Sequence, residues 1–380
     1  VEPHVARVIV VSPSDTGIRQ ARAKTDRLDA RTLAKLLAAG SLEGLWLPDE
    51  RIRALRRRLQ RRSRLVRART RAKNEVHGAL IRHLIAKPKV SDLFGVAGRR
   101  WLESLELPAE ERETIDGALR QIDFLEQELS EVERAIAKDA LSSVEIRRLM
   151  SVPGVNVFTA ATFLAAIGEV SRFPSARRLV GYLGLDPRVR QSGSGPATHG
   201  RISKQGSAPA RYALVEAAWS VVRQPGPLRA FYERIRARRG HQVAIVASAR
   251  KLASLFWCLL TREQDYAYAQ PSLTNKKLRR LELAAGAQRG RVKPGIWAAN
   301  AAMRDAEREL GREAEIAYAR TVADWQAQRR GAGATPGRAS SRPPGGKQRG
   351  RASVPDPALC SSSPAPRALL QGGVQESRPT

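Results

Sequence analysis

The hydrophobic positions of the chain change their spacing along the sequence and predict a mainly helical protein. Residues 5–11, which contain the apolar run Val8-Ile9-Val10-Val11, are typical of a buried strand. Residues 25–39 instead repeat apolar positions at helical spacing, and Gly40 closes that helix. A strand followed by a helix indicates the end of an α/β unit. We therefore expect a mainly α fold with a small α/β remnant at its start.

Two longer helices are predicted at residues 50–85, after the capping residue Asp49, and 110–140. The first carries twelve Lys or Arg and no acid between Arg51 and Lys73. Its narrow apolar seam consists of Ile52, Leu55, Leu59, Val66, Val76, Leu80 and Leu84. The second helix has heptad-like apolar spacing and an acidic outer face. Opposite charge makes the two helices antiparallel partners, within one chain or between the protomers of a homo-oligomer.

Residues 147–170 have the pattern of a helix-hairpin-helix. One helix ends near Ser151, Pro153-Gly154-Val155 forms a tight hairpin, and an Ala-rich helix begins near Asn156. Backbone N–H groups at Gly154 and at the start of the second helix are suited to meet a phosphate. A plain helical turn is the alternative interpretation.

A polar, Gly-rich loop spans residues 191–207, and Ser207 is suited to cap a helix from Ala208 to Arg223. A serine in this loop is a candidate nucleophile toward a phosphodiester, with basic groups nearby that would hold the phosphate. Those basic residues are Arg201, Lys204 and Arg211. Taken alone, however, most Ser-Gly loops are only loops.

Further along, a basic helix at 228–239 and an apolar helix at 242–260 are expected to complete a second core. A looser region begins around Tyr266 and Tyr268, and 300–328 is one more predicted helix. Residues 331–380 are dominated by Pro, Gly, Ser and Arg, a composition that cannot bury a core and predicts disorder.

The net charge of the chain indicates what kind of partner it binds. The 380 residues include 67 Lys plus Arg against 37 Asp plus Glu, a net charge of +30. Such a charge predicts a polyanionic partner, above all nucleic acid, contacted by the first long helix. No stretch approaches the roughly 18 apolar residues of a membrane span, and no signal segment opens the chain, so no membrane partner is expected. The helix residues expected to contact phosphates are Arg56, Arg57, Arg61 and Arg64.

Two acidic residues stand near the start of the first helix, in the sequence Lys24-Thr25-Asp26-Arg27-Leu28-Asp29-Ala30. Thr25 is suited to cap this helix, which places Asp26 and Asp29 on one helical face. Two such carboxylates can hold a divalent cation such as Mg²⁺. They can also simply complement the helix dipole, and spacing alone favours that interpretation.

Taken in order, these segments resemble the DEDD transposases of the insertion-sequence 110/1111 type, over about residues 5–260. The resemblance is carried by Lys-Thr-Asp-Arg-Leu-Asp-Ala at 24–30, Trp-Leu-Pro-Asp-Glu at 46–50, the Arg-rich helix, Val-Pro-Gly-Val at 152–155, the segment 172–185, Gln-Ser-Gly at 191–193 and Arg-Ile-Ser-Lys-Gln-Gly at 201–206.

The resemblance implies a RuvC-like domain with four acidic residues and Mg²⁺, a coiled-coil arm, and a transposase domain that supplies a serine nucleophile. The Asp-x-x-Asp pair falls on Asp26 and Asp29, and the serine on Ser192, with Ser194 as the alternative. The family's other two acids precede this motif, and neither Glu2 nor Asp15 matches them. We therefore expect an N-terminally truncated chain with half of the acidic site.

The implied domains are a truncated RuvC-like domain at 1–48, a coiled-coil arm at 49–145, a helix-hairpin-helix and transposase domain at 146–265, a basic helical extension at 266–330 and a disordered tail at 331–380. We expect a cytoplasmic, nucleoid-associated recombinase that acts on DNA. Some members of the family are guided by a structured RNA encoded by the element, which makes such an RNA a second candidate partner. A Holliday-junction-type metal nuclease and an inactive nucleic-acid-binding fragment are the alternatives.

Overall fold

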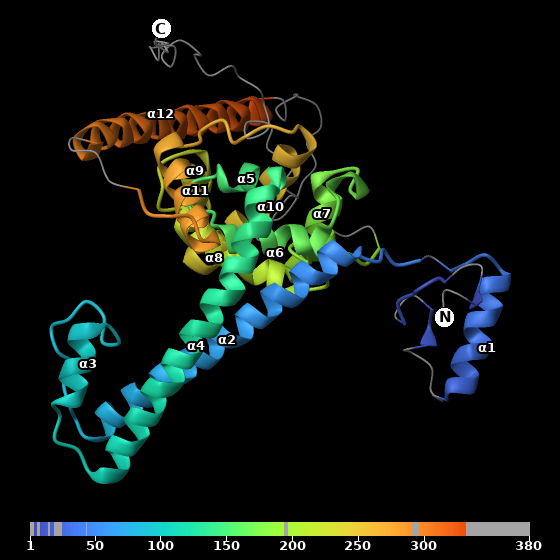
Figure 1. The fold of residues 1–380 in the computed structure, drawn as a ribbon. Coiled ribbons are helices and arrows are strands. Elements are labelled where there is room, and N and C mark those ends of the chain that lie inside the picture. Colours follow the sequence, from blue (N-terminus) through green and yellow to red (C-terminus); the bar gives the residue numbers. More distant parts are fainter. Residues whose placement is uncertain are drawn as a thin grey trace, which may run out of the picture. The chain divides into compact units, whose positions relative to one another are not determined.

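The computed structural model describes residues 4–5, 8–13, 16–18, 25–42, 44–193, 197–290 and 296–331. It divides into two compact units, residues 1–54 and 55–380, which are described separately below. Most of the described residues are helical, which confirms the mainly α prediction (Figure 1). The tail predicted to be disordered lies, apart from Gly331, outside the described residues.

The first unit contains the capped helix that the sequence predicts. Helix α1 (Asp26–Ala38) begins after Thr25, whose hydroxyl accepts a hydrogen bond from the Leu28 N–H at 3.3 Å. The strand expected at 5–11 is wrong where the structure describes it, because residues 8–12 form no ladder. A backbone hydrogen bond joins this stretch to a later segment, from the Leu45 N–H to the Val10 carbonyl, at 2.7 Å. Apolar residues alone do not make a strand without a partner strand to pair with.

Two long helices form an antiparallel arm (Figure 1). Helix α2 (Glu50–Arg82) follows Asp49, whose carboxylate accepts from the Ile52 N–H at 2.7 Å, as predicted. Helix α4 (Ala109–Ser142) buries a continuous seam against it, and α3 (Val96–Glu103) lies at the far end. The seam residues of α4 are Ile115, Ala118, Ile122, Leu125, Leu129, Val132 and Ile136.

The far end of the arm has an apolar cluster of its own, in which Leu80 of α2, Ile115 of α4 and Leu102 of α3 are buried together. Arg99 ties α3 to α4, because its guanidinium donates to Asp123 at 2.9 Å. Leu84 was expected in the α2 seam but lies beyond the end of the helix, 93% exposed. The reversal of the chain there removes Leu84 from the helical register, and Ile85 packs against the cluster instead.

Most of the remaining helices surround one larger hydrophobic core, and burial of this apolar surface drives their association. Phe163 and Phe256 meet edge to face at its centre, with ring centroids 4.9 Å apart. The elements are α5 (Val144–Met150), α6 (Val157–Ile167), the short η3 (Val170–Arg172), α7 (Ala176–Tyr182), α8 (Ala208–Val221), α9 (Pro227–Arg239), α10 (His241–Thr261) and α11 (Pro271–Ala285).

Helix α10 corrects the expectation that no stretch of the chain approaches the apolar length of a membrane span. Among the described helices it alone is long and apolar enough to cross a membrane. Most of it is buried within the core, where Leu252, Phe256 and Leu259 pack against the other helices. Its apolar length therefore has an explanation in the packing of the core.

The segment predicted as a Gly-rich loop from residue 191 to 207 contains the second strand of a β-hairpin, which is a second correction. Strands β1 (Pro187–Arg190) and β2 (Thr198–Ile202) pair antiparallel, with Val189 opposite His199. The hairpin was missed because its strands are polar and β1 is mostly exposed, so the sequence lacks the alternation of a half-buried sheet.

The region expected to loosen after Tyr266 is ordered instead. The Tyr266 N–H donates to the Ser151 hydroxyl at 2.9 Å, and the Tyr266 side chain is buried. Helix α11 follows, and α12 (Ile296–Gly331) extends the predicted last helix at both ends. The carboxylate of Glu307 in α12 accepts from the Ser272 N–H of α11 at 2.7 Å.

Candidate nucleic-acid interface

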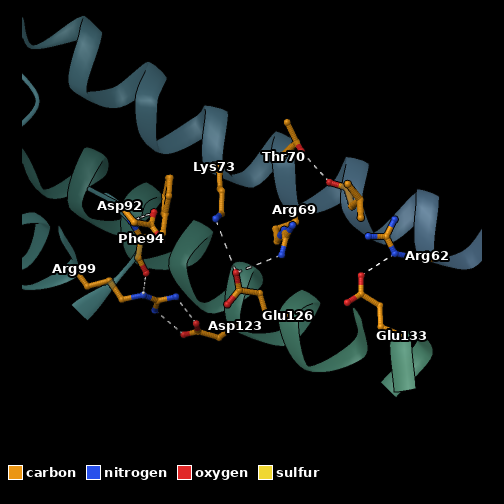
Figure 2. A network of polar contacts seen from close by, with 11 residues as sticks. Arg62, Arg69, Thr70, Lys73, Asp92, Phe94, Arg99, Asp123, Glu126 and Glu133 are labelled. Atoms are coloured by element: carbon orange, nitrogen blue, oxygen red, sulfur yellow. Dashed lines mark hydrogen bonds and ion pairs between the residues drawn. The ribbon is translucent and has the colours of Figure 1, made fainter. Parts of the chain in front are cut away.

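One set of basic residues on α2 faces α4 and forms ion pairs with its acids. Figure 2 shows Arg62 beside Glu133, at 2.7 Å, and Glu126 between Arg69 and Lys73. Further pairs join Arg58 to Asp139, Arg61 to Glu128 and Arg82 to Glu111. The predicted match of opposite charges is thus made within one chain. These cations are paired within the arm and present less charge to a partner.

A second set of arginines on α2 points away from α4. Arg64, Arg67 and Arg71 are exposed and spaced three and four residues apart, which places them on one face of the helix. Arg64 and Arg71 make no ion pair with any described residue, and the Arg67 guanidinium donates only to the Ser63 carbonyl of its own helix, at 3.1 Å. We call Arg64, Arg67 and Arg71 the outer arginines. Their charge is available to phosphates.

The four α2 arginines that the sequence predicts to contact phosphates lie in different surroundings. Arg64 is an outer arginine, and Arg57 is exposed seven residues before it on the same face. Arg61 pairs with Glu128. The Arg56 guanidinium donates to the carbonyls of Ala165 at 2.6 Å and Ala166 at 3.2 Å. Arg56 therefore satisfies carbonyls at the C-terminal end of α6, a role invisible in the sequence because its partners lie more than a hundred residues away.

Ser192 lies in the turn between β1 and β2 and is exposed. The strands around it carry Arg188, Arg190 and Arg201, which are exposed as well. The alternative serine, Ser194, lies outside the described residues. The hairpin thus presents a hydroxyl among several exposed cations, which could hold a phosphate beside it.

The base of this hairpin is held rigidly. Ser203 donates from its N–H to the Asp186 carbonyl at 2.8 Å and from its hydroxyl to the Asp186 carboxylate at 2.7 Å. The Lys204 N–H donates to the Gly184 carbonyl at 3.0 Å. Gly184 is required there, because a β carbon would overlap the Gln205 carbonyl oxygen. Strands fixed at their base carry the Ser192 turn in a defined direction.

The basic residues predicted beside the serine, like those of α2, include both exposed cations and a cation bonded to protein groups. Arg201 and Lys204 are exposed. Arg211 donates from Nη1 to the carbonyls of Leu183 and Gly206, each at 3.1 Å, so it helps to fix the loop. Ser207 caps α8 as predicted, accepting from the Ala210 N–H at 3.3 Å.

The helix-hairpin-helix pattern is also present. Helices α5 and α6 flank the hairpin, and the Asn156 side chain caps α6 by accepting from the Thr159 N–H at 2.8 Å. Gly154 has φ +86°, and a β carbon there would lie 2.7 Å from the Val221 nitrogen of α8. Close packing against α8 therefore explains the need for glycine at 154. Its contact with a phosphate stays a prediction.

Helix α11 secures the same hairpin through a buried cation. Lys277 donates from Nζ to the carbonyls of Met150 at 2.7 Å and Val152 at 2.8 Å. Burial lowers the pKa of Lys277 to about 8. Sequence reasoning missed this residue, because nothing in its local sequence separates it from the exposed Lys276.

Asp26 and Asp29 both lie in the first turn of α1, where they complement the helix dipole. Among the described residues, no group of three or more His, Cys, Asp or Glu is placed to hold a metal ion. Mg²⁺ prefers six oxygen ligands, and two carboxylates supply only part of that set. The described residues therefore do not complete a magnesium site.

Comparison with known proteins gives two family matches, one in the N-terminal part of the chain and one in the segment that follows the arm. The sequence model of the transposase family IS116/IS110/IS902 matches residues 146–233, and a second transposase model, that of the IS110 DEDD type, matches residues 4–84. The first covers the helix-hairpin-helix and the Ser192 hairpin. The second covers the Asp26 motif and α2.

Individual relatives agree with these matches. A probable family 20 transposase of Pseudomonas aeruginosa is 30% identical over 250 residues, covering 64% of this chain and 74% of the relative. The transposase for insertion sequence element IS1111A of Coxiella burnetii is 27% identical over 252 residues, covering 64% and 68%. A putative transposase of Sinorhizobium fredii, y4qE, is 32% identical over 213 residues, and the chain spans about half of its length, 52%.

Proposed function

Because the chain belongs to the IS116/IS110/IS902 family of transposases, we propose that it binds DNA and cleaves and rejoins phosphodiesters to move an insertion sequence. The observation that carries this proposal is the exposed Ser192 in the turn of a basic hairpin with a rigid base. The family supports a RuvC-like origin for the first unit.

In the proposed step, the Ser192 oxygen attacks the phosphorus of a DNA phosphodiester. A new oxygen–phosphorus bond to serine forms as the bond to one deoxyribose oxygen breaks. The serine proton passes to solvent, and the departing oxygen takes up a proton. Attack by a DNA hydroxyl on the serine-linked phosphate reverses the step and joins the strands. One phosphodiester replaces another throughout, so no external energy source is needed. Arg188, Arg190 and Arg201 would stabilise the charge on the phosphate.

The outer arginines of α2 are proposed to bind the backbone of DNA, or of a structured guide RNA encoded by the element. Phosphate contacts serve either partner, because they do not depend on base sequence. We also propose that the chain forms a homo-oligomer through its arm, where Ile81, Val96 and Phe124 remain exposed. A DNA-acting transposase would work in the cytoplasm, at the nucleoid.

Divalent-metal use is a property that the DEDD family suggests. We propose that Asp26 and Asp29 contribute carboxylate oxygens to that metal, with Mg²⁺ as the expected ion. They would bind it and orient it. Two carboxylates in the first turn of α1 hold such an ion weakly by themselves, so binding by the present chain should be of low affinity.

The test is to trap a protein–DNA adduct on a denaturing gel, using labelled DNA that carries the ends of the insertion sequence. Any adduct that the wild-type chain forms should persist in Ser63→Ala, a control at an exposed serine of α2, and should be absent in Ser192→Ala. Duplex binding should be equal in all three. Cleavage without any adduct would favour a hydrolytic nuclease, and binding without cleavage would favour a non-catalytic protein.

A further inference from the structure

Helix α12 lies against α9 and α11 and is attached to them by two carboxylates (Figure 1). Glu307 accepts hydrogen bonds from the Ser272 N–H, at 2.7 Å, and from the Ser272 hydroxyl, in the first turn of α11. Glu315 accepts from the Gly226 N–H at 3.1 Å, where α9 begins, and pairs with the Arg229 guanidinium at 3.5 Å. Both carboxylates therefore lie at the start of a helix, where unpaired N–H groups and the helix dipole favour an anion.

The rest of the attachment of α12 is a narrow stripe. The side chains of Ala314, Tyr318 and Val322 are buried, and their spacing of four residues puts them on one face of the helix. One turn earlier, a β carbon at Gly311 would lie 3.0 Å from the Pro225 carbonyl oxygen, so the two backbones approach closely. Most other described side chains of α12 are exposed, and the buried three lie outside the main apolar cluster. Helix α12 can therefore leave its place without opening that cluster.

The position that Glu315 occupies borders the helix-hairpin-helix. Val152 and Pro153 of the hairpin line the same surface pocket as Gly226 and Arg229. An N–H at the start of a helix and a neighbouring guanidinium are also the groups that hold a phosphate oxygen. Here they hold a carboxylate from the same chain, which is direct evidence that the position accepts an anionic oxygen. Helix α12 itself lies outside both segments that match the transposase models.

We propose that α12 is an autoinhibitory strap, in which the Glu315 carboxylate occupies a position that a nucleic-acid phosphate takes when α12 is displaced. This inference rests on the proposed function, because it presupposes that the chain binds DNA. The phosphates of a DNA backbone repeat along the strand, so a duplex can replace the carboxylate while it makes other contacts. A chain with a net charge of +30 attracts polyanions unspecifically, and a strap that must be displaced disfavours single weak contacts.

The test compares the binding of a labelled random-sequence DNA duplex by the full chain and its variants over a range of salt concentrations. The double variant Glu307→Gln/Glu315→Gln removes both attaching charges. Its affinity should rise roughly tenfold, as for the gain of one charged hydrogen bond. The slope of log affinity against log salt should steepen by about 0.9, for the one phosphate that Arg229 then neutralises. The control Glu309→Gln/Glu313→Gln changes the net charge equally at exposed acids of α12 and should leave both quantities near wild type.

Arg229→Gln separates release of the strap from a general effect of charge. Alone, it should change the slope little, because Glu315 already occupies the guanidinium. Combined with the double variant, it should abolish most of the gain in slope. A gain that survives Arg229→Gln, or a double variant that binds no tighter than its control, would overturn the proposal.

A second measurement uses the unaltered chain. Backbone hydrogen exchange in residues 300–328 should become faster when a saturating duplex is added, because a helix released from its packing frays. Unchanged or slower exchange would show that DNA binds with α12 in place and would overturn the proposal. This result decides alone if thermal unfolding shows that the double variant does not fold. Failure of the proposed function would appear separately, as absence of a Ser192-dependent adduct.

Discussion

The arm and the helical core of the second unit are stabilised in different ways. The core buries a large apolar cluster drawn from many helices, with Phe163 and Phe256 in contact within it. The arm has two helices, a narrow seam, and ion pairs such as Arg62–Glu133 and Arg69–Glu126 along its edge. Ion pairs at such a partly exposed edge add little stability, typically under about 1 kcal/mol each. Burial of apolar side chains therefore stabilises the core, while much of the arm's surface consists of charged side chains.

The largest effect should come from the core. Phe163→Ala removes a fully buried ring and leaves a cavity, so we expect a loss of about 3–5 kcal/mol in the free energy of unfolding. The matched change in the arm is Phe124→Ala, at a ring that is 62% exposed, and it should cost little. Urea denaturation of both variants measures the difference. Equal losses would contradict the contrast between arm and core.

The next effect concerns the base of the hairpin. Gly184 has φ +69° and no room for a β carbon, so Gly184→Ala should destabilise the protein by more than about 1 kcal/mol. Gly181, three residues earlier in α7, has open space around its α carbon, and Gly181→Ala should be neutral or slightly stabilising. Thermal unfolding distinguishes the two. A harmless Gly184→Ala would show that the base is not rigid.

Buried and exposed cations should respond differently to pH. The pKa of Lys277 is lowered to about 8 in the folded protein, from an ordinary value near 10.5. Between these values the unfolded chain binds the extra proton, so stability should rise with pH in that window, by at most about 1.4 kcal/mol per unit. Below pH 8 both states are protonated and Lys277 adds no slope.

Lys277→Met should remove that rise, whereas Lys276→Met, at the exposed neighbour, should keep it. The measurement is urea denaturation at several values between pH 7.5 and about 10.5. An unchanged pH profile in Lys277→Met would show that the Nζ group is not desolvated as the structure indicates.

The smallest effects on stability, and the clearest on binding, should come from α2. Replacing Arg64, Arg67 and Arg71 by Gln should leave stability nearly unchanged and flatten the salt slope for duplex DNA by about 0.9 for each phosphate that is no longer neutralised. Replacing the paired Arg58, Arg61 and Arg62 should cost up to about 1 kcal/mol per pair and change the slope less. The opposite result would mean that the inner residues contact the nucleic acid.

Sequence reasoning succeeded where the determining groups are close together in the chain. The caps Thr25, Asp49 and Ser207 each bond to a backbone N–H three residues later, so a local pattern was enough to find them. The helices of the arm follow from apolar spacing and charge in the same way. These elements account for most of the mainly α fold.

Prediction from the sequence failed where a residue bonds to a group that is distant in the chain. Arg56 looked like a phosphate contact, yet it bonds to Ala165 and Ala166, and Lys277 bonds to Met150 and Val152. A basic residue in a sequence does not reveal whether its partner is a carbonyl, a carboxylate or a phosphate. The strand expected at 5–11 shows the same limit, because pairing depends on a second segment that the local pattern does not specify.

The proposed role of Ser192 as the nucleophile is tested most directly by identifying the residue that is joined to DNA. The trapped adduct would be digested with nuclease and protease, and the peptide that carries a residual nucleotide mapped by mass spectrometry. Attack by the Ser192 hydroxyl predicts that the nucleotide lies on Ser192. A nucleotide on any other residue, Ser194 included, or DNA cleavage with no modified peptide, would contradict it.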